Sequence, residues 1–236
     1  MAREIRDHYF RRAKKEGYLS RAAYKLIEID ERRKILTSGD RVLDCGAAPG
    51  SWLQVASRRV GQSGFVIGID LKPIKHSFVM PHAAEVRTLA ADLREIPAGE
   101  LLALLPAGSA AGSALFDVIL SDMAPDTTGD RTIDHHQSIR LCEAVLDRCP
   151  DLLKSGGHVV IKVLEGEAYP DLRARTRRMF DAVKGFKPKA SRNESTEIYL
   201  IGKGYTGGDG APEPVAADEP AVELPRGKPS TGWAGR

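Results

Sequence analysis

The chain has 236 residues, of which 42% are apolar and 28% are charged, and its formal net charge is +3. These values are ordinary for a globular protein and exclude wholly disordered, collagen-like and disulfide-rich classes. The most apolar stretch, residues 101–120, is interrupted by Pro106, Gly108 and Asp117, so we expect no membrane-spanning segment.

The three cysteines are too far apart in sequence to form a metal-binding pair. Cys45, Cys142 and Cys149 show no C-x-x-C spacing, so we expect reduced thiols, no zinc finger and no structural metal. Residues 1–7 contain both basic and acidic side chains and no apolar core, which argues against a secretory signal or a transit peptide. The expected compartment is the cytoplasm.

Short β-branched runs alternate with longer helical stretches along the chain. Ser20 is predicted to be the N-cap of a helix that runs to Glu31. Apolar residues at helical spacing predict a second helix from Ile139 to Leu153, bent at Pro150. We expect strands at residues 41–44, 65–70, 86–90, 116–121, 158–164 and 197–201. This alternation predicts an α/β fold with a parallel sheet and helices on both faces.

Basic residues gather in two segments that flank a near-neutral middle. Residues 1–34 hold eleven lysines and arginines against six acidic residues, and residues 171–192 hold eight against two. The two segments would hold a polyanion such as nucleic acid if the fold brings them together. The alternative, that both are solvated helix faces, stays open at this point.

The composition changes at Lys203, because twelve of the last 34 residues are glycine or proline. Such a segment cannot bury enough apolar surface to offset the entropy lost on ordering. We therefore expect a basic helical segment, residues 1–34, packed on a domain of residues 35–202, followed by a flexible tail, residues 203–236.

The most informative stretch is an apolar strand that ends in an acid and is followed by a small-residue loop, residues 42–52. Small residues at this first turn of a doubly wound sheet let a ligand approach the backbone. The spacing is not G-x-G-x-x-G, and Pro49 removes an amide, which argues against a dinucleotide. A ligand with an amino-acid group and a ribose suits this loop better than a dinucleotide does. The alternative is a plain tight turn that binds no ligand. Asp70, which ends the next strand, would accept the ribose hydroxyls.

Acidic residues stand at four strand ends, namely Asp44, Asp70, Asp92 and Asp122. Asp92 would accept the exocyclic amine of adenine, although a simple loop aspartate is the alternative. Lys162 lies within an apolar strand, where a lysine is costly unless it points into a site or finds a partner. The alternative for Lys162 is a side chain that reaches solvent from the strand end.

Together these motifs resemble the FtsJ family of ribosomal RNA 2′-O-methyltransferases, of the large-subunit (RlmE) type. The resemblance runs in order from about residue 8 to residue 203. The matching pieces are residues 20–26, 43–52, 68–71, 121–125, 160–163 and 191–199. The resemblance implies one Rossmann-like methyltransferase domain that uses S-adenosylmethionine, with a mostly parallel seven-stranded sheet.

The resemblance also implies site residues. The catalytic tetrad of the family falls on Lys25, Asp122, Lys162 and Glu197. Its cofactor residues fall on Gly50, Trp52, Asp70, Asp92 and Asp122. We expect the methionine end of the cofactor between Gly46 and Gly50. This chain has Ser51 where many members have a second glycine.

Methyl transfer from a sulfonium requires alignment and activation of the accepting hydroxyl. If Lys162 is neutral, it acts as the base, and if it is charged, it orients the hydroxyl and stabilises the developing alkoxide. The sequence leaves both possibilities open. His135 and His136 lack a third ligand at metal spacing, so we expect no metal there.

The expected function is methylation of ribosomal RNA in the large subunit, and the resemblance implies a uridine in the peptidyl-transferase region as the target. We expect a monomer and no membrane partner. Three alternatives remain: the transfer RNA branch of the family, a non-catalytic RNA-binding assembly factor, and a small-molecule methyltransferase. Met123, within Ser-Asp-Met-Ala-Pro, and the Ser-Arg-x-Glu-Ser run favour the ribosomal branch.

Overall fold

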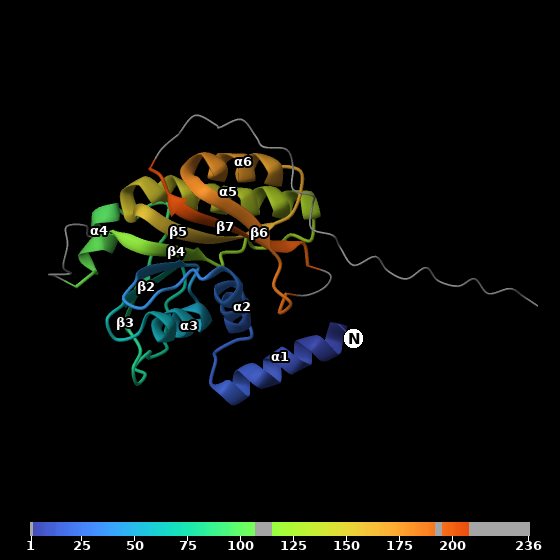
Figure 1. Ribbon diagram of the computed structural model, residues 1–236. Coiled ribbons are helices and arrows are strands. Elements are labelled where there is room, and N and C mark those ends of the chain that lie inside the picture. The colour runs from blue at the N-terminus through green and yellow to red at the C-terminus, as the bar shows by residue number, and fades with distance from the viewer. Residues whose placement is uncertain (1, 107–114, 192–194, 208–236) are drawn as a thin grey trace, which may run out of the picture.

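The computed structural model describes residues 2–106, 115–191 and 195–207, with side chains from His8 onward. The described chain forms one sheet of seven strands in the spatial order β3-β2-β1-β4-β5-β7-β6 (Figure 1). Their bounds are β1 Arg41–Cys45, β2 Phe65–Asp70, β3 Glu85–Ala90, β4 Phe116–Ser121, β5 Leu153–Leu164, β6 Phe180–Phe186 and β7 Glu197–Tyr205. β7 runs antiparallel to β5 and β6, and the other pairs are parallel. The expected seven-stranded, mostly parallel α/β fold is confirmed.

Helices cover both faces of the sheet (Figure 1). One layer contains α2 (Ala23–Arg33) and α3 (Ser51–Val60), and α1 (Ala2–Glu16) lies on the side of this layer that is away from the sheet (Figure 1). The other contains α4 (Ala98–Ala103), α5 (Arg131–Leu152) and α6 (Tyr169–Met179). Within the described residues, no helix has both the length and the hydropathy needed to cross a bilayer.

The sheet separates two apolar cores because side chains alternate between its faces. Val42 and Val160 lie in the core beneath α2 and α3, whereas Leu43 and Ile161 lie in the core beneath α5. All four side chains are buried. A polar residue that continues the row of Val42 or Val160 must therefore face the layer of α2 and α3.

The strand ends differ from the predicted ones at the antiparallel side of the sheet. β7 continues past residue 201 to Tyr205, because Lys203 still pairs with His158 and Tyr205 with Phe180. The predicted start of the tail at residue 203 is therefore wrong, and residues 208–236 lie outside the described chain. β6 was not located from sequence, because this edge strand pairs only with β7 and has several exposed side chains.

Two helices also differ from expectation. α5 starts at Arg131, where the Asp130 side chain accepts hydrogen bonds from two backbone N–H groups of the first turn. Pro150 does not interrupt this helix but lies in its last turn. Ser20 is not the N-cap of α2, since that position belongs to Ala22. Instead the Ser20 hydroxyl accepts from the N–H of Ala22 at 3.2 Å and contacts Oγ of Ser51 at 2.7 Å, which ties the start of α2 to α3.

Candidate active site

The candidate active site lies at the carboxyl edge of the parallel strands, on the face covered by α2 and α3. Asp122 comes directly after β4 and continues the row of Leu120, which packs in the core beneath α2 and α3. Lys162 on β5 continues the row of Val160 in the same way. On β7, Glu197 shares this face with Tyr199. Because side chains alternate between the two faces along each strand, Asp122, Lys162 and Glu197 all project from the face covered by α2 and α3.

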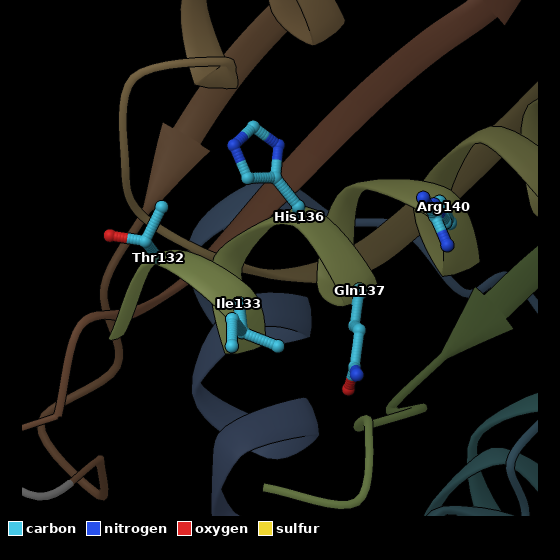
Figure 2. Close-up of a pocket in the computed structure, with 5 residues that line it drawn as sticks. All are labelled: Thr132, Ile133, His136, Gln137 and Arg140. Carbon is cyan, nitrogen blue, oxygen red and sulfur yellow. The ribbon is translucent and has the colours of Figure 1, made fainter. Parts of the chain in front are cut away.

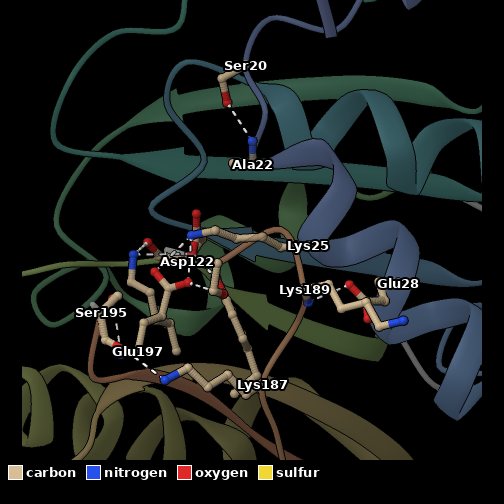
Figure 3. Close-up of polar contacts among 12 residues, drawn as sticks. Ser20, Ala22, Lys25, Glu28, Asp122, Lys187, Lys189, Ser195 and Glu197 are labelled. Carbon is tan, nitrogen blue, oxygen red and sulfur yellow. Dashed lines mark hydrogen bonds and ion pairs between the residues drawn. The ribbon is translucent and has the colours of Figure 1, made fainter. Parts of the chain in front are cut away.

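The four predicted tetrad residues form two ion pairs in this region. Nζ of Lys162 lies 3.1 Å from Oδ1 of Asp122 and also donates to the backbone carbonyl of Asp122. Nζ of Lys25, from α2, lies 2.7 Å from Oε1 and 2.8 Å from Oε2 of Glu197. Figure 3 shows Lys25 extending from its helix toward Asp122 and Glu197. The structure thus brings together the predicted tetrad.

Both ion pairs are largely removed from water. Lys25 and Lys162 are each 8% exposed, and Glu197 is 9% exposed. Burial of a lone charge would be costly, so each lysine at this site requires its acid. Each of the two lysines therefore faces one acid of the tetrad.

Tyr199 links the two pairs and was missed as a site residue. Its hydroxyl donates to Oδ1 of Asp122 at 2.7 Å, and its ring centre lies 5.8 Å from Nζ of Lys25. The ring also packs against Trp52 at 5.7 Å between centroids. Burial, followed by the charges of Asp122 and Glu197, raises the pKa of Tyr199 well above its usual value. The sequence could have indicated Tyr199 as a site residue, because Tyr199 and Glu197 are two residues apart on one strand and so share a face.

Ser191 is a second contact that sequence reasoning did not assign. Its hydroxyl donates to Oε1 of Glu197 at 2.8 Å, and the side chain is 5% exposed. Glu197 is therefore held from two sides, by Lys25 and by Ser191. The orientation of this carboxylate does not depend on the lysine alone.

The loop after β1 packs tightly against side chains of other segments at its two glycines. Gly46 has φ 73°, and a Cβ there would meet Met123 at 2.6 Å. Gly50 has φ 114°, and a Cβ there would meet the ring of Phe78 at 2.4 Å. Both positions therefore require glycine. Trp52, at the start of α3, donates from Nε1 to the carbonyl of Ala22 at 2.9 Å and joins this loop to α2.

The predicted ribose and adenine acids have different surroundings. Asp70 accepts from the N–H of Ala48 at 2.9 Å and from the N–H of Lys72 at 2.8 Å, so the loop holds its carboxylate in place. Asp92 forms an ion pair of 2.5 Å with Arg94, and this contact lowers the pKa of Asp92. Any ligand group that reaches Asp92 must therefore share it with Arg94.

Histidines and cysteines near the site have structural partners. Nδ1 of His135 contacts the carbonyl of Leu164 at 2.7 Å, and Nε2 accepts from the N–H of Ala168 at 3.0 Å. These two contacts fix the loop between β5 and α6.

Cys142 and Cys149 lie in the core beneath α5, where burial raises the pKa of both thiols to about 12.

A surface hollow of about 300 Å³ lies elsewhere, on the outer side of α5 (Figure 2). Its lining residues are Thr132, Ile133, His136, Gln137 and Arg140. None of them belongs to the predicted site.

The two basic segments converge only in part. The backbone N–H of Lys189 donates to Glu28 of α2 at 2.7 Å, as Figure 3 shows. Ala190 belongs to a small apolar cluster with Ala13 of α1 and Tyr24 of α2, so residues 189–190 lie against the first segment. The arginines of α6 lie on the opposite face of the sheet, since Leu172 packs in the core beneath α5. The expectation that the two whole segments form a single basic surface is therefore wrong.

The sequence of the described fold matches a family model. A model with the description FtsJ-like methyltransferase covers residues 18–205. The chain belongs to the FtsJ-like methyltransferase family. The resemblance expected from the motifs is thus confirmed.

Three similar proteins have names that refer to ribosomal RNA methylation. The ribosomal RNA large subunit methyltransferase E of Syntrophobacter fumaroxidans is 46% identical over 202 residues, which cover 86% of this chain and 97% of the relative. The protein of the same name from Halobacterium salinarum is 40% identical over 220 residues, which cover 93% and 80%. A crystal structure described as a ribosomal RNA methyltransferase of Plasmodium falciparum matches with a TM-score of 0.67 and 30% identity, covering 80% of this chain and 100% of the other.

Proposed function

We propose that this FtsJ-like methyltransferase transfers a methyl group from S-adenosylmethionine to the ribose 2′-hydroxyl of a uridine in large-subunit ribosomal RNA. The observation that carries the proposal is the meeting of two buried lysine–acid pairs at the carboxyl edge of the sheet. Relatives at 46% and 40% identity, named for large-subunit ribosomal RNA methylation, support the choice of substrate.

The contacts of Lys162 support a charged amine at this position. Its Nζ is placed against two acceptors, a carboxylate oxygen and a carbonyl oxygen of Asp122. An ammonium has three N–H donors, so these contacts leave one donor for the ribose hydroxyl. In this proposal Lys162 orients the hydroxyl and stabilises negative charge as it develops on oxygen. The oxygen would take the methyl group as its bond to the donor sulfur breaks, and the hydroxyl proton would pass to solvent. The alternative role as a general base requires the amine to be neutral.

The loop and strand ends fit a donor that carries an amino-acid group and an adenosine. When bound, S-adenosylmethionine supplies an activated methyl group on a sulfonium. Its amino-acid end is proposed to lie along the loop between Gly46 and Gly50, which these two glycines hold tightly against Met123 and Phe78. Asp70 keeps lone pairs free for the ribose hydroxyls, because each carboxylate oxygen accepts more than one hydrogen bond. Asp92 is proposed to accept the adenine amine, and Asp122 to lie between the donor and Lys162.

The RNA is proposed to contact the first basic segment together with residues 187–191. The basic residues of α1, Arg11, Arg12, Lys14 and Lys15, are exposed, as are Lys187 and Lys189, and Ala190 belongs to one apolar cluster with Ala13 of α1. Positive side chains on such a surface would bind phosphates of the RNA backbone. We further propose a monomer that acts in the cytoplasm on ribosomal RNA within the large subunit.

Mapping of ribose methylation in total RNA, with and without the gene, tests the function. We expect loss of methylation at one uridine of the large-subunit RNA. Purified protein with S-adenosylmethionine should restore it on large subunits from the deletion strain. Loss at a transfer RNA position instead would place the protein in the transfer RNA branch. Unchanged methylation of both RNA classes would contradict catalysis and favour an assembly factor.

A further inference from the structure

Asp44 differs from the other acids at this edge of the sheet because neither of its carboxylate oxygens has a hydrogen-bond partner within the described residues. Its side chain is 0% exposed. Asp70 accepts two backbone N–H groups, and Asp122 accepts from Tyr199 and pairs with Lys162. Burial of a carboxylate without partners is energetically costly, so its charge state needs a physical explanation.

The groups that face Asp44 do not supply a positive charge. β2 contributes Asp70 and the end of β4 contributes Asp122, and both are acids. The neighbouring Cys45 is a buried thiol on the same strand. The buried side of α3, which packs against β1, contains no charged residue. The two buried lysines of the site are already paired, Lys162 with Asp122 and Lys25 with Glu197.

These surroundings favour the neutral acid in the free protein. Burial has the largest effect, and the charges of Asp122 and Asp70 add to it, so that the pKa of Asp44 lies well above its ordinary value. At a pH below that pKa, the group becomes ionised when a cation arrives beside it.

The proposed donor brings such a cation to this place. Asp44 stands two residues before Gly46, where the proposed function puts the amino-acid end of S-adenosylmethionine. We propose that Asp44 carries a proton in the ligand-free protein and releases it to solvent when the ammonium of the donor binds beside it. The inference rests on the proposed function. The O–H bond of the acid breaks, the proton passes to buffer, and the ammonium keeps its own protons.

Proton release makes donor affinity depend on pH. Below the pKa of Asp44, the Kd for the donor should fall about tenfold for each unit of rising pH, because one proton is linked to binding. Above that pKa the Kd should become independent of pH. The ammonium, not the sulfonium, is the partner in this account. S-adenosylhomocysteine, which keeps the ammonium, should therefore behave like the donor.

Calorimetric titration in two buffers of different ionisation enthalpy measures the proton count directly. S-adenosylmethionine and S-adenosylhomocysteine should each release about one proton at a pH below the pKa of Asp44. 5′-Methylthioadenosine, which keeps the adenosine and thioether but lacks the amino-acid group, should release none. Asp44→Asn should abolish proton release with every ligand. The control Asp92→Asn changes the proposed adenine contact but leaves the charges of Asp70 and Asp122 in place, so it should weaken binding and keep the proton count.

Three results would overturn the inference. They are donor binding to the parent protein without proton release, equal release with 5′-methylthioadenosine, and unchanged release in a folded Asp44→Asn variant. The comparison of the three ligands uses the parent protein alone, so it decides the question even if the variant fails to fold. Absence of any donor binding to the parent would instead contradict the proposed function, and the inference with it.

Discussion

The hydroxyl of Tyr199 and the amine of Lys162 meet on one oxygen atom. Oδ1 of Asp122 accepts from Tyr199 at 2.7 Å and lies 3.1 Å from Nζ of Lys162. The two donors are directly opposite each other in the register of β5 and β7. Asp122 is thus oriented by two strands at once, and its position does not depend on the lysine alone.

Tyr199→Phe tests this arrangement. The change removes one hydrogen bond to a carboxylate, worth about 1.4 kcal/mol, so kcat should fall about tenfold while KM for RNA stays unchanged. Steady-state methylation of large subunits measures both values. Tyr205→Phe is the matched control, because this buried tyrosine is on the same strand but in the core beneath α5. Equal effects of the two variants would argue against a specific role of the Tyr199 hydroxyl.

The ion pair between Lys25 and Glu197 should contribute to folding as well as to the site. Lys25→Met leaves a buried carboxylate that keeps Ser191 as a hydrogen-bond partner but has lost its cation, and should lower the free energy of unfolding by about 3 kcal/mol. Urea denaturation measures this value. The double variant Lys25→Met/Glu197→Gln should recover most of the loss, because no charge is left unpaired. A double variant no more stable than the single one would contradict the pairing argument.

Asp44 should make the protein less stable as pH rises. Its folded pKa is raised above the unfolded value of about 3.9, so between these two values the folded state binds more protons than the unfolded state. The free energy of unfolding should therefore fall by about 1.4 kcal/mol per pH unit in that window through this group alone. Asp44→Asn should remove this contribution. Parallel pH dependences of the variant and the parent, by urea denaturation without ligand, would show that Asp44 is not perturbed.

The division of basic residues between the two faces predicts unequal roles in RNA binding. Lys14→Glu/Lys15→Glu should weaken RNA binding and reduce the slope of log Kd against log salt by about one for each phosphate that the variant no longer neutralises. Arg177→Glu/Arg178→Glu on α6 makes the same change of charge on the opposite face and should have little effect. Filter binding across a salt series compares them. A larger effect of the α6 variant would place the RNA on the other side of the sheet.

The sequence predicted the parts of the site that depend on strand alternation and position. Asp122 and Lys162 stand at or near the ends of strongly apolar strands, so their placement at one edge followed from the parallel sheet. The role of Tyr199 was harder to predict, because a tyrosine in an apolar strand has the pattern of a core residue. The missing partners of Asp44 depend on what β2, β4 and α3 place around it, which no local pattern records.

Prediction of the strands and helices from the sequence had the same limits. Central strands such as β2 were predicted with their observed bounds, because burial on both faces requires a continuous apolar run. β6 is an edge strand of mixed composition and carries no such run. Charge counts alone could not assign the α6 arginines to a face, since that depends on which side of the sheet the helix crosses.

The most direct test of the account is the rate of single-turnover methylation by Lys162 variants on undermethylated large subunits. Lys162→Ala should lose more than about a hundredfold in rate, while donor affinity measured by calorimetry stays within about twofold of the parent. Lys162→Arg, which stays charged at every accessible pH, should retain more activity than Lys162→Ala if the amine acts as a cation. A Lys162→Ala enzyme with more than about a tenth of the parent rate would contradict the account, because less than about 1.4 kcal/mol of barrier lowering would then depend on this side chain.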